Sequence, residues 1–357
     1  MDPRSALITI ATLSLAGFLV ALSAAPFVAK ILFKYKCWKK TVRTTAPDGS
    51  ATPIFSALHK DKETSTPRMA GILMGGAVII VAVLAWLGAR LFPDTALAQF
   101  DFMNRSQTWI PIFTFVAASL LGLLDDLLVV GGFGDSGKGG GIKFRHRLLV
   151  VLAIGLVGAY WFHFKLGWDM LHIPLVGDVF INGWYIPIFI VVLLGVFSSS
   201  VVDGIDGLAG GIFAILFATF AAIAFARGQF FLSAFCAVLV GTLLAFLWFN
   251  IPPAKFYMGE TGILGLTTTL AVVAFFTNTV LLLPIAGIVL VIEAGSVAIQ
   301  LFSKKVFKKK VFLCAPYHHH LEALGWPAHR VTMRLWLITG VACMITLVIA
   351  LLDIIHL

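Results

Sequence analysis

The chain has 357 residues, of which 60% are hydrophobic and only 12% are charged, and its mean hydropathy is +0.99. These values exclude a soluble globular protein of ordinary surface composition and indicate a polytopic integral membrane protein. The formal net charge of +9 does not point to nucleic acid, because the 26 Lys and Arg residues cluster between apolar runs, as they do in membrane proteins. The four Cys residues have no paired spacing, so neither a disulfide framework nor a zinc site is expected.

A membrane-spanning helix needs about 20 mostly apolar residues. Ten runs near that length predict about ten transmembrane helices, at residues 6–33, 70–92, 109–128, 148–164, 184–202, 208–226, 230–249, 262–278, 280–303 and 335–354. The N-terminus has no basic segment leading to a cleavage site, so the first run is expected to be retained as a span. Residues 1–357 are therefore expected to form one all-α transmembrane domain without a separate soluble domain.

The positions of Lys and Arg predict the orientation of these spans. Twenty of the 26 lie in the connections after the first, third, fifth, seventh and ninth spans. By the positive-inside rule these connections are cytoplasmic, and both termini are expected outside. The polar clusters at Asp125-Asp126, Asp203 to Asp206, Asn250 to Gly262 and His318-His319-His320 all fall at cytoplasmic connections. One face of the membrane is therefore expected to carry the chemistry.

Asp125 and Asp126 close the third apolar run. Adjacent carboxylates repel unless a cation or a shared proton relieves them, so such pairs recur as divalent-metal sites or as a general base. The alternative is a simple helix end, although the helix dipole disfavours negative charge there. The glycine-rich stretch 131–141 that follows is not a P-loop, because Gly139 stands where Ser or Thr is required and no strand precedes it.

Asp203 and Asp206 lie three residues apart between two apolar runs, and they share a face if the segment is a helical turn. Each is followed by glycine, so backbone amides could approach a phosphate while the carboxylates hold a metal or a sugar hydroxyl. The alternative is a solvated loop.

The segment Asn250 to Gly262 offers an amide, a cation, an aromatic ring and a carboxylate within a loop that two prolines stiffen. This set suits a nucleotide, with an aromatic ring to stack on a base, Lys255 for phosphate and Glu260 for Mg²⁺. An ordinary connecting loop is the alternative.

Three consecutive histidines, His318-His319-His320, precede the tenth apolar run. Neighbours on a helix point about 100° apart, so the three cannot all face one metal ion. They suit hydrogen bonding to phosphate or sugar better. Glu293 lies inside the ninth run, and it is expected to hydrogen bond between helices.

Together these segments resemble the polyprenyl-phosphate phospho-sugar transferase superfamily, and most closely its phospho-N-acetylmuramoyl-pentapeptide transferase branch. The matching segments are Thr66-Pro67-Arg68-Met69, Gly122 to Asp126, Asp203 to Ala209, Phe249 to Gly262, Glu293 to Gln300 and Ala315 to Glu322 with Gly325-Trp326. They follow the family's order from about residue 60 to 326. The histidine triplet with its flanks is what singles out this branch.

The resemblance implies a ten-span enzyme of the bacterial plasma membrane, typically a homodimer, with its active site facing the cytoplasm. It implies Mg²⁺ as cofactor, a UDP-linked sugar peptide as donor and undecaprenyl phosphate as acceptor, with UMP and a lipid-linked cell-wall precursor as products. The implied catalytic residues are Asp125, Asp126 and Asp206, and the implied metal ligands are Glu260 and Asp126. The implied substrate-binding residues are Asp203, Asn250, Tyr257, Lys255, Arg147, His318, His319 and His320.

Some positions depart from the family pattern. Glu260 stands where the family usually has Asp, and Phe197 and Ser200 stand where it commonly has Asn. A catalytically weakened relative is therefore an alternative. A sister-branch transferase of UDP-N-acetylhexosamine is a second, because Thr66-Pro67-Arg68 and Pro252 to Lys255 look more like that branch. A membrane transporter is a third, although no paired repeat is visible.

Overall fold

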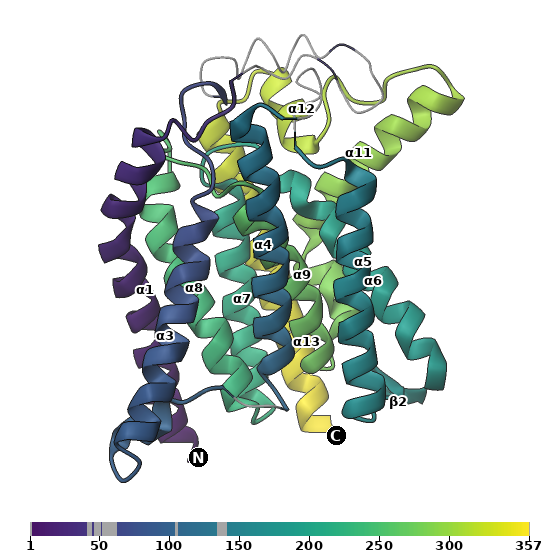
Figure 1. Cartoon of the computed structure of the whole chain (residues 1–357). Helices are drawn as coiled ribbons and strands as arrows, with labels where there is room; N and C mark the ends of the chain where they lie inside the picture. The colour runs from purple at the N-terminus through teal and green to yellow at the C-terminus, as the bar shows by residue number, and fades with distance from the viewer. Residues whose placement is uncertain are drawn as a thin grey trace.

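The computed structural model describes residues 2–40, 45, 51, 63–103, 106–133 and 141–356. These residues form a bundle of long helices lying side by side, with both termini at one end (Figure 1). In chain order the elements are α1 (Pro3–Lys34), α3 (Gly71–Leu91), η1 (Ala96–Phe100), α4 (Trp109–Gly131), α5 (Phe144–Tyr160), η3 (Trp161–Lys165), β1 (Met170–Ile173), β2 (Gly177–Phe180), η4 (Asn182–Trp184), α6 (Tyr185–Ser198), η5 (Ser199–Val202), α7 (Leu208–Ala226), α8 (Phe230–Asn250), α9 (Gly259–Phe276), η6 (Val280–Leu282), α10 (Leu283–Ala286), α11 (Ile288–Val306), α12 (Tyr317–Ala323) and α13 (Ala328–His356).

The expected all-α membrane fold is confirmed. Nine helical segments in the described part of the chain are long and apolar enough to cross a membrane, and a bent pair makes a tenth. The ninth predicted run, 280–303, is not one straight helix as expected: Val280–Ala286 and Ile288–Val306 meet at 79°. The break falls at Gly287, whose φ of −91° and ψ of 27° depart from helical values. Glycine is a poor helix residue, so the bend forms there at little cost.

Helix α9 lies at the centre of the bundle. Of the most apolar 18-residue stretch of α9, 94% is buried inside the protein, whereas the same measure for α1 is 28%. Helix α4 packs closely on α9 because Gly122 lies against the carbonyl group of Glu260, where a Cβ atom would collide. The outer helices instead expose large apolar side chains, such as Ile8 on α1 and Leu337 on α13. This distribution is that of a helical bundle with lipid as its outer solvent.

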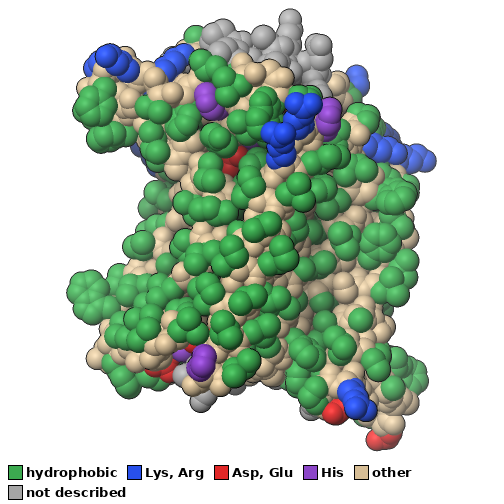
Figure 2. All heavy atoms as spheres, turned by 180° about the vertical axis from the view of Figure 1, so that it is seen from behind, with side chains coloured by type: hydrophobic (Ala, Val, Ile, Leu, Met, Phe, Trp, Pro, Cys, Tyr) green, Lys and Arg blue, Asp and Glu red, His purple; other side chains and the backbone are tan. Residues whose placement is uncertain are grey.

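The two ends of the bundle differ in charge. Figure 2 shows apolar side chains over the flank and most of the visible Lys and Arg at the end opposite the termini. Helix α11 projects from the bundle at this basic end (Figure 1), with Phe302 and Val306 exposed and a run of lysines from Lys304 to Lys310 at its end. The separation of positive charge inferred from the sequence therefore also holds in three dimensions.

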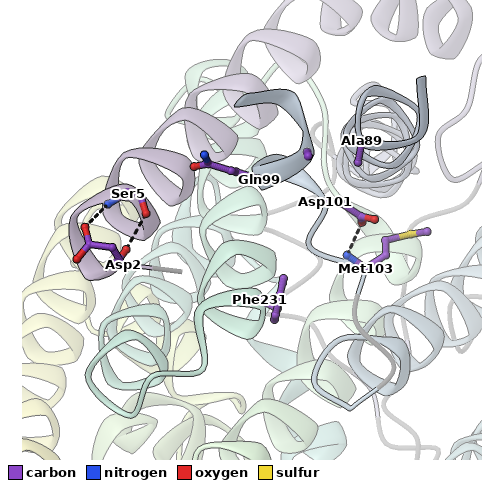
Figure 3. A pocket seen from close by; sticks show the side chains of 8 residues that line it. Asp2, Ser5, Ala89, Gln99, Asp101, Met103 and Phe231 are labelled. Carbon is purple, nitrogen blue, oxygen red and sulfur yellow. Dashed lines mark hydrogen bonds between the residues drawn. The ribbon is translucent and has the colours of Figure 1, made fainter. Parts of the chain in front are cut away.

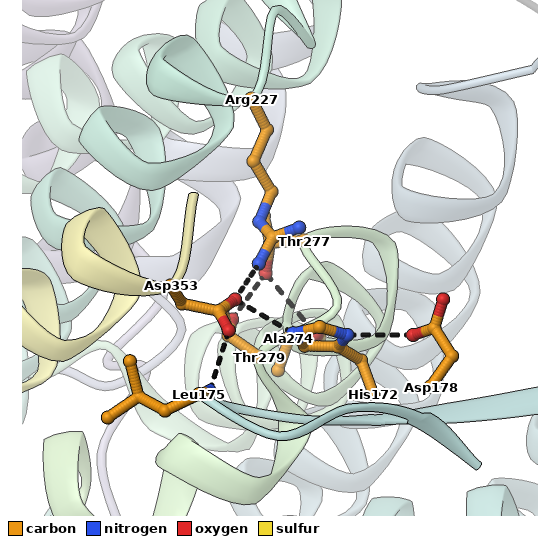
Figure 4. Close-up of polar contacts among 8 residues, drawn as sticks. All are labelled: His172, Leu175, Asp178, Arg227, Ala274, Thr277, Thr279 and Asp353. Atoms are coloured by element: carbon orange, nitrogen blue, oxygen red, sulfur yellow. Dashed lines mark hydrogen bonds and ion pairs between the residues drawn. The ribbon is translucent and has the colours of Figure 1, made fainter. Parts of the chain in front are cut away.

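A short antiparallel hairpin of β1 and β2, paired with Met170 opposite Phe180, lies at the end that carries the termini. Its His172 contacts two carboxylates, with Nδ1 2.7 Å from Asp178 and Nε2 2.8 Å from Asp353 on α13 (Figure 4). Arg227, at the end of α7, donates to the same Asp353 at 2.8 Å, and the backbone N–H of Leu175 donates to its other oxygen. We call these side chains the hairpin clasp, because they tie the hairpin to two helices.

Candidate functional site

The predicted carboxylates meet at the basic end of the bundle. Asp125 and Asp126 come from α4, Asp203 from the turn before α7, and Glu260 from the first turn of α9. Asp125 and Asp126 lie within α4 and not at its end, and their exposed fractions are only 3% and 0%. Buried acids require cations or hydrogen-bond donors around them.

Asp126 receives two hydrogen bonds on one oxygen, from the backbone N–H of Thr261 at 2.9 Å and from its hydroxyl at 2.8 Å. Its other oxygen, Oδ1, lies 3.5 Å from Nε of Arg68. Gly259 has a φ of +69°, and a Cβ there would collide with the Asp126 carboxylate. A glycine is therefore required where the loop before α9 folds over this side chain.

Asp125 and Glu260 are joined by one arginine. Arg147, in the first turn of α5, places Nη1 2.9 Å from Oε1 of Glu260 and 3.6 Å from Oδ2 of Asp125. The backbone N–H of Ile142 donates to the other oxygen of Asp125. Arg147 thus connects α4, α5 and α9 around the carboxylates, and the structure places it inside the predicted site.

Asp203 and Asp206 do not share one helical face, because the segment between η5 and α7 is an irregular turn. Asp203 faces the carboxylate cluster: burial raises its pKa to about 7, with Arg68 opposing this shift and Glu260 adding to it. Asp206 instead accepts hydrogen bonds from the backbone N–H of Ala254 and from the hydroxyl of Tyr257, each at 3.2 Å. The two acids therefore line different walls of the site.

The loop before α9 packs against the turn that carries Asp206, and together they form one wall of the site. Burial, and then the charge of Asp206, raise the pKa of Tyr257, so its phenol stays protonated and donates to that carboxylate. Asn250 accepts from the N–H of Gly207 at 3.0 Å and donates to the carbonyl of Phe256 at 2.8 Å, so its amide holds the loop against the turn. Lys255 is exposed and lies over the ring of Phe249.

The three histidines of α12 have three different partners, in agreement with the sequence argument against a shared metal. His318 Nδ1 lies 2.9 Å from Glu293 of α11, and both side chains are fully buried. His319 Nδ1 lies 2.7 Å from Glu322, and His320 Nδ1 accepts from the N–H of Leu313. The prediction that Glu293 bonds between helices is confirmed.

Of the residues that depart from the family pattern, Phe197 is buried and stacks on Phe144 of α5, with ring centroids 6.2 Å apart. An amide at this position would lose that contact. Sequence reasoning assigned no role to Arg68 or Thr261, both of which contact Asp126 directly. Arg68 lies in Thr66-Pro67-Arg68-Met69, one of the segments that resemble the family, so an ion pair between Arg68 and the acids could have been expected.

Two features of the cluster fit a divalent cation. Asp126 Oδ1 and Glu260 Oε2 are buried oxygens without a hydrogen-bond partner. The four carboxyl groups of the cluster also outnumber the two guanidinium groups, those of Arg68 and Arg147, that face them. No three Asp, Glu, His or Cys side chains in the described residues form a ready metal site. Mg²⁺ commonly binds one or two carboxylates together with substrate phosphates, so the donor set suits it.

A cavity of about 710 Å³ lies at the opposite end of the bundle, lined by Asp2, Gln99, Asp101 and Phe231 among others (Figure 3). Asp2 caps α1 by accepting from the backbone N–H groups of the residues that follow it, and Asp101 accepts from the N–H of Met103. These carboxylates have local structural roles, and the cavity lies away from the carboxylate cluster.

The fold and the cluster define a multi-pass membrane enzyme that holds paired carboxylates and arginines at one end of a helical bundle. A model of glycosyl transferase family 4 matches residues 108–278. The chain is 32% identical to a phospho-N-acetylmuramoyl-pentapeptide-transferase of Chloroflexus aurantiacus, over 92% of this chain and 89% of that protein. Proteins with the same name from Levilactobacillus brevis and Caldanaerobacter subterraneus are 35% and 31% identical, over 77% and 93% of this chain and 81% and 96% of theirs. The chain belongs to the phospho-N-acetylmuramoyl-pentapeptide-transferase family.

Proposed function

We propose that this protein transfers phospho-N-acetylmuramoyl-pentapeptide from a UDP-linked donor to undecaprenyl phosphate, with release of UMP. The observation that carries this proposal is the convergence of Asp125, Asp126, Asp203 and Glu260 with two arginines, in a chain of this family. An oxygen of the lipid phosphate forms a bond to the sugar-linked phosphorus of the donor. The bond from that phosphorus to the UMP oxygen breaks, and the product is a lipid-linked pyrophosphoryl sugar.

The reaction brings two anions together, so positioning and charge neutralisation dominate catalysis. Asp125 is the candidate that orients the acceptor phosphate. Arg147 holds this carboxylate and Glu260 together, which fixes the distance between α4 and α9. The wall formed by Asp206 and Tyr257 offers a place for the nucleotide, with Asn250 keeping that wall in position.

Mg²⁺ is proposed as the cofactor, held by Asp126 and Glu260 through the two unpartnered oxygens. When bound, it would neutralise charge on the donor pyrophosphate. We further propose that the basic end of the bundle faces the cytoplasm, because Lys and Arg gather there. A homodimer stays a prediction from the family.

The experiment is a donor panel scored by UMP release. Purified full-length protein in detergent is given undecaprenyl phosphate with MgCl₂, and either UDP-N-acetylmuramoyl-pentapeptide or a UDP-N-acetylhexosamine. Release of UMP from the peptide-bearing donor, abolished by EDTA and restored by Mg²⁺, is expected. Release from the UDP-N-acetylhexosamine alone would assign the chain to the sister-branch activity. No release from either donor by folded protein would reject phospho-sugar transfer and leave a transporter as the alternative.

A further inference from the structure

Arg68, the cation closest to Asp126, belongs to the cluster but has no role of its own in the function proposed above. Arg68 lies in the segment before α3, and this segment is hydrogen bonded to the loop before α9. The N–H of Tyr257 donates to the carbonyl of Pro67 at 2.8 Å, and the N–H groups of Ala70 and Gly71 donate back to that loop at 3.0 and 2.9 Å. The backbone on either side of Arg68 is therefore fixed against residues 257–258.

A further hydrogen bond ties Arg68 to α1. Its own N–H donates to the carbonyl of Cys37, which lies just beyond the end of that helix, at 2.7 Å. The chain just beyond α1, the start of α3 and the loop before α9 thus fix the position of the Arg68 Cα atom. A residue held in this way is positioned before any ligand arrives, which lowers the entropy cost of binding.

The side chain of Arg68 extends into the carboxylate cluster, where Asp126, Glu260 and Asp203 all act on its charge. It forms an ion pair with Asp126 at 3.5 Å, a distance at the limit for a hydrogen bond. Its Nε and the facing Oδ1 of Asp126 are both buried without a hydrogen-bond partner.

Two other arginines among the described residues also meet acids, but at shorter distances. Arg147 lies 2.9 Å from Glu260, and Arg227 donates to Asp353 at 2.8 Å. One Nη atom of each of these guanidinium groups thus lies at hydrogen-bond distance from a carboxylate of the protein, although Nε of both is without a hydrogen-bond partner, as it is in Arg68. The side chains of Arg68 and Arg147 are equally exposed, at 21%, but the carboxylate oxygen that faces Arg68 is 3.5 Å away, so the protein holds this guanidinium group less tightly.

We propose that Arg68 binds the pyrophosphate of the UDP-linked donor, held ready for it by Asp126. The guanidinium fork matches two oxygens of a phosphate group, and it carries charge at every physiological pH. This inference rests on the proposed phospho-sugar transfer. It assigns Arg68 to the donor, whereas Arg147 acts between Asp125 and Glu260.

The test measures initial rates of UMP release by the full-length protein while donor and acceptor are varied separately. Arg68→Gln is expected to raise the KM for donor about tenfold and to lower kcat/KM for donor about 100-fold, with the KM for undecaprenyl phosphate unchanged. Arg68→Lys keeps the charge but loses the fork of the guanidinium group. Its kcat/KM for donor is expected to lie between those of the wild type and Arg68→Gln. Free guanidinium ion is expected to restore part of the activity of Arg68→Ala.

Lys39→Gln is the matched control, because Lys39 is a cation of the neighbouring segment that pairs with Glu63. Its kinetic constants are expected to stay at wild-type values. If Arg68→Gln does not elute as a single species, Arg68→Lys and guanidinium rescue of Arg68→Ala give the decision.

A wild-type KM for donor in the Arg68 variants would overturn the inference and leave the proposed function standing. So would a lower kcat with unchanged KM and no guanidinium rescue, since that result describes a residue that only positions Asp126. Failure of the proposed function is separate: it is the absence of UMP release by the wild-type protein itself.

Discussion

At the scale of the single residue, Glu260 shows how a departure from the family pattern can be built into a site. Its carboxylate reaches Arg147 at 2.9 Å, and Arg147 also reaches Asp125. A side chain one methylene shorter would draw this carboxylate back from the guanidinium group. The geometry therefore argues for a site adapted to Glu and against a catalytically weakened relative.

We predict that Glu260→Asp lowers kcat for UMP release by about 10- to 100-fold, because a displacement of about 1 Å at a reacting centre costs this much. Initial rates at saturating donor and acceptor give the measurement. Glu63→Asp makes the same shortening at the ion pair with Lys39 and is expected to leave kcat unchanged. A gain in turnover for Glu260→Asp would show that the natural residue limits the enzyme.

Asp126 gives a second prediction at this scale. Asp126→Asn keeps the size of the side chain and an oxygen that can accept from Thr261, but it removes the charge that faces Arg68. Loss of such a charged group in a buried site is expected to lower kcat/KM by about 100-fold or more, with the protein still folded. The same change at Asp178, in the hairpin at the other end, is the control for rates. Activity within threefold of wild type would remove Asp126 from the site.

At the residue scale, the sequence predicts features formed by residues that are close together in the chain better than contacts between residues that are far apart in it. The acids were found because pairs such as Asp125-Asp126 are adjacent and conspicuous between apolar runs. The contact of Thr261 with Asp126 and the ion pair of Arg68 join residues far apart in the chain, and only the packing of α3, α4 and α9 brings them together. Asn250 was singled out as a nucleotide contact, whereas its backbone partners Gly207 and Phe256 could not be inferred from spacing.

At the scale of the element, the apolar runs predicted all ten spans within a few residues at most ends. Hydropathy shows how long an apolar segment is, but it does not show whether that segment forms one straight helix or two helices with a bend between them. The 79° bend at Gly287 was therefore missed. The segment 203–206 was missed for a related reason, because a three-residue spacing fits a helical turn and an irregular turn equally well.

The contact of α4 with α9 positions most of the cluster, and it depends on Gly122. A Cβ at this position would collide with the backbone of Glu260 and Thr261. We predict that Gly122→Ala destabilises the protein by about 1–3 kcal/mol through overpacking and also displaces Glu260 from Arg147. A lower melting temperature together with a lower rate of UMP release would confirm it.

Gly75→Ala is the control for this change, because Gly75 is also a helical glycine and a Cβ there would meet no atom within 4 Å. It is expected to leave both quantities unchanged or to raise the melting temperature slightly, since Ala is the better helix residue. Equal effects of the two substitutions would mean that the contact of α4 with α9 does not depend on Gly122.

At the scale of the whole molecule, α13 connects the two ends of the bundle. Near its start, the Thr332 hydroxyl donates to the carbonyl of Asp206 at 3.0 Å, and Trp336 Nε1 donates to the carbonyl of Gly207 at 3.2 Å. Near its end, Asp353 takes part in the hairpin clasp (Figure 4). One helix therefore supports the turn of the site and anchors the hairpin at the other end.

In the hairpin clasp, one histidine contacts a buried and an exposed carboxylate, so the effect of burial on the stabilisation by each contact can be compared. His172 contacts both Asp353, which is 2% exposed, and Asp178, whose side chain is 50% exposed. Each ring nitrogen of His172 faces a carboxylate oxygen, at 2.7 Å from Asp178 and at 2.8 Å from Asp353. Removal of the buried carboxylate would leave the Arg227 guanidinium group without its counter-charge and would remove the partner of His172 Nε2.

We predict that Asp353→Asn destabilises the protein by about 3–5 kcal/mol, because breaking a buried pair leaves an uncompensated charge. Asp178→Asn removes a carboxylate from the same histidine at an exposed position, and it is expected to cost about 0–1 kcal/mol. Melting temperatures of the two variants and the wild type in one detergent provide the comparison. The melting temperature of Asp353→Asn is expected to fall by several degrees and that of Asp178→Asn by a degree or two at most. Equal shifts would mean that burial of Asp353 does not set the strength of the clasp, and that the exposed contact on β2 holds the hairpin equally well.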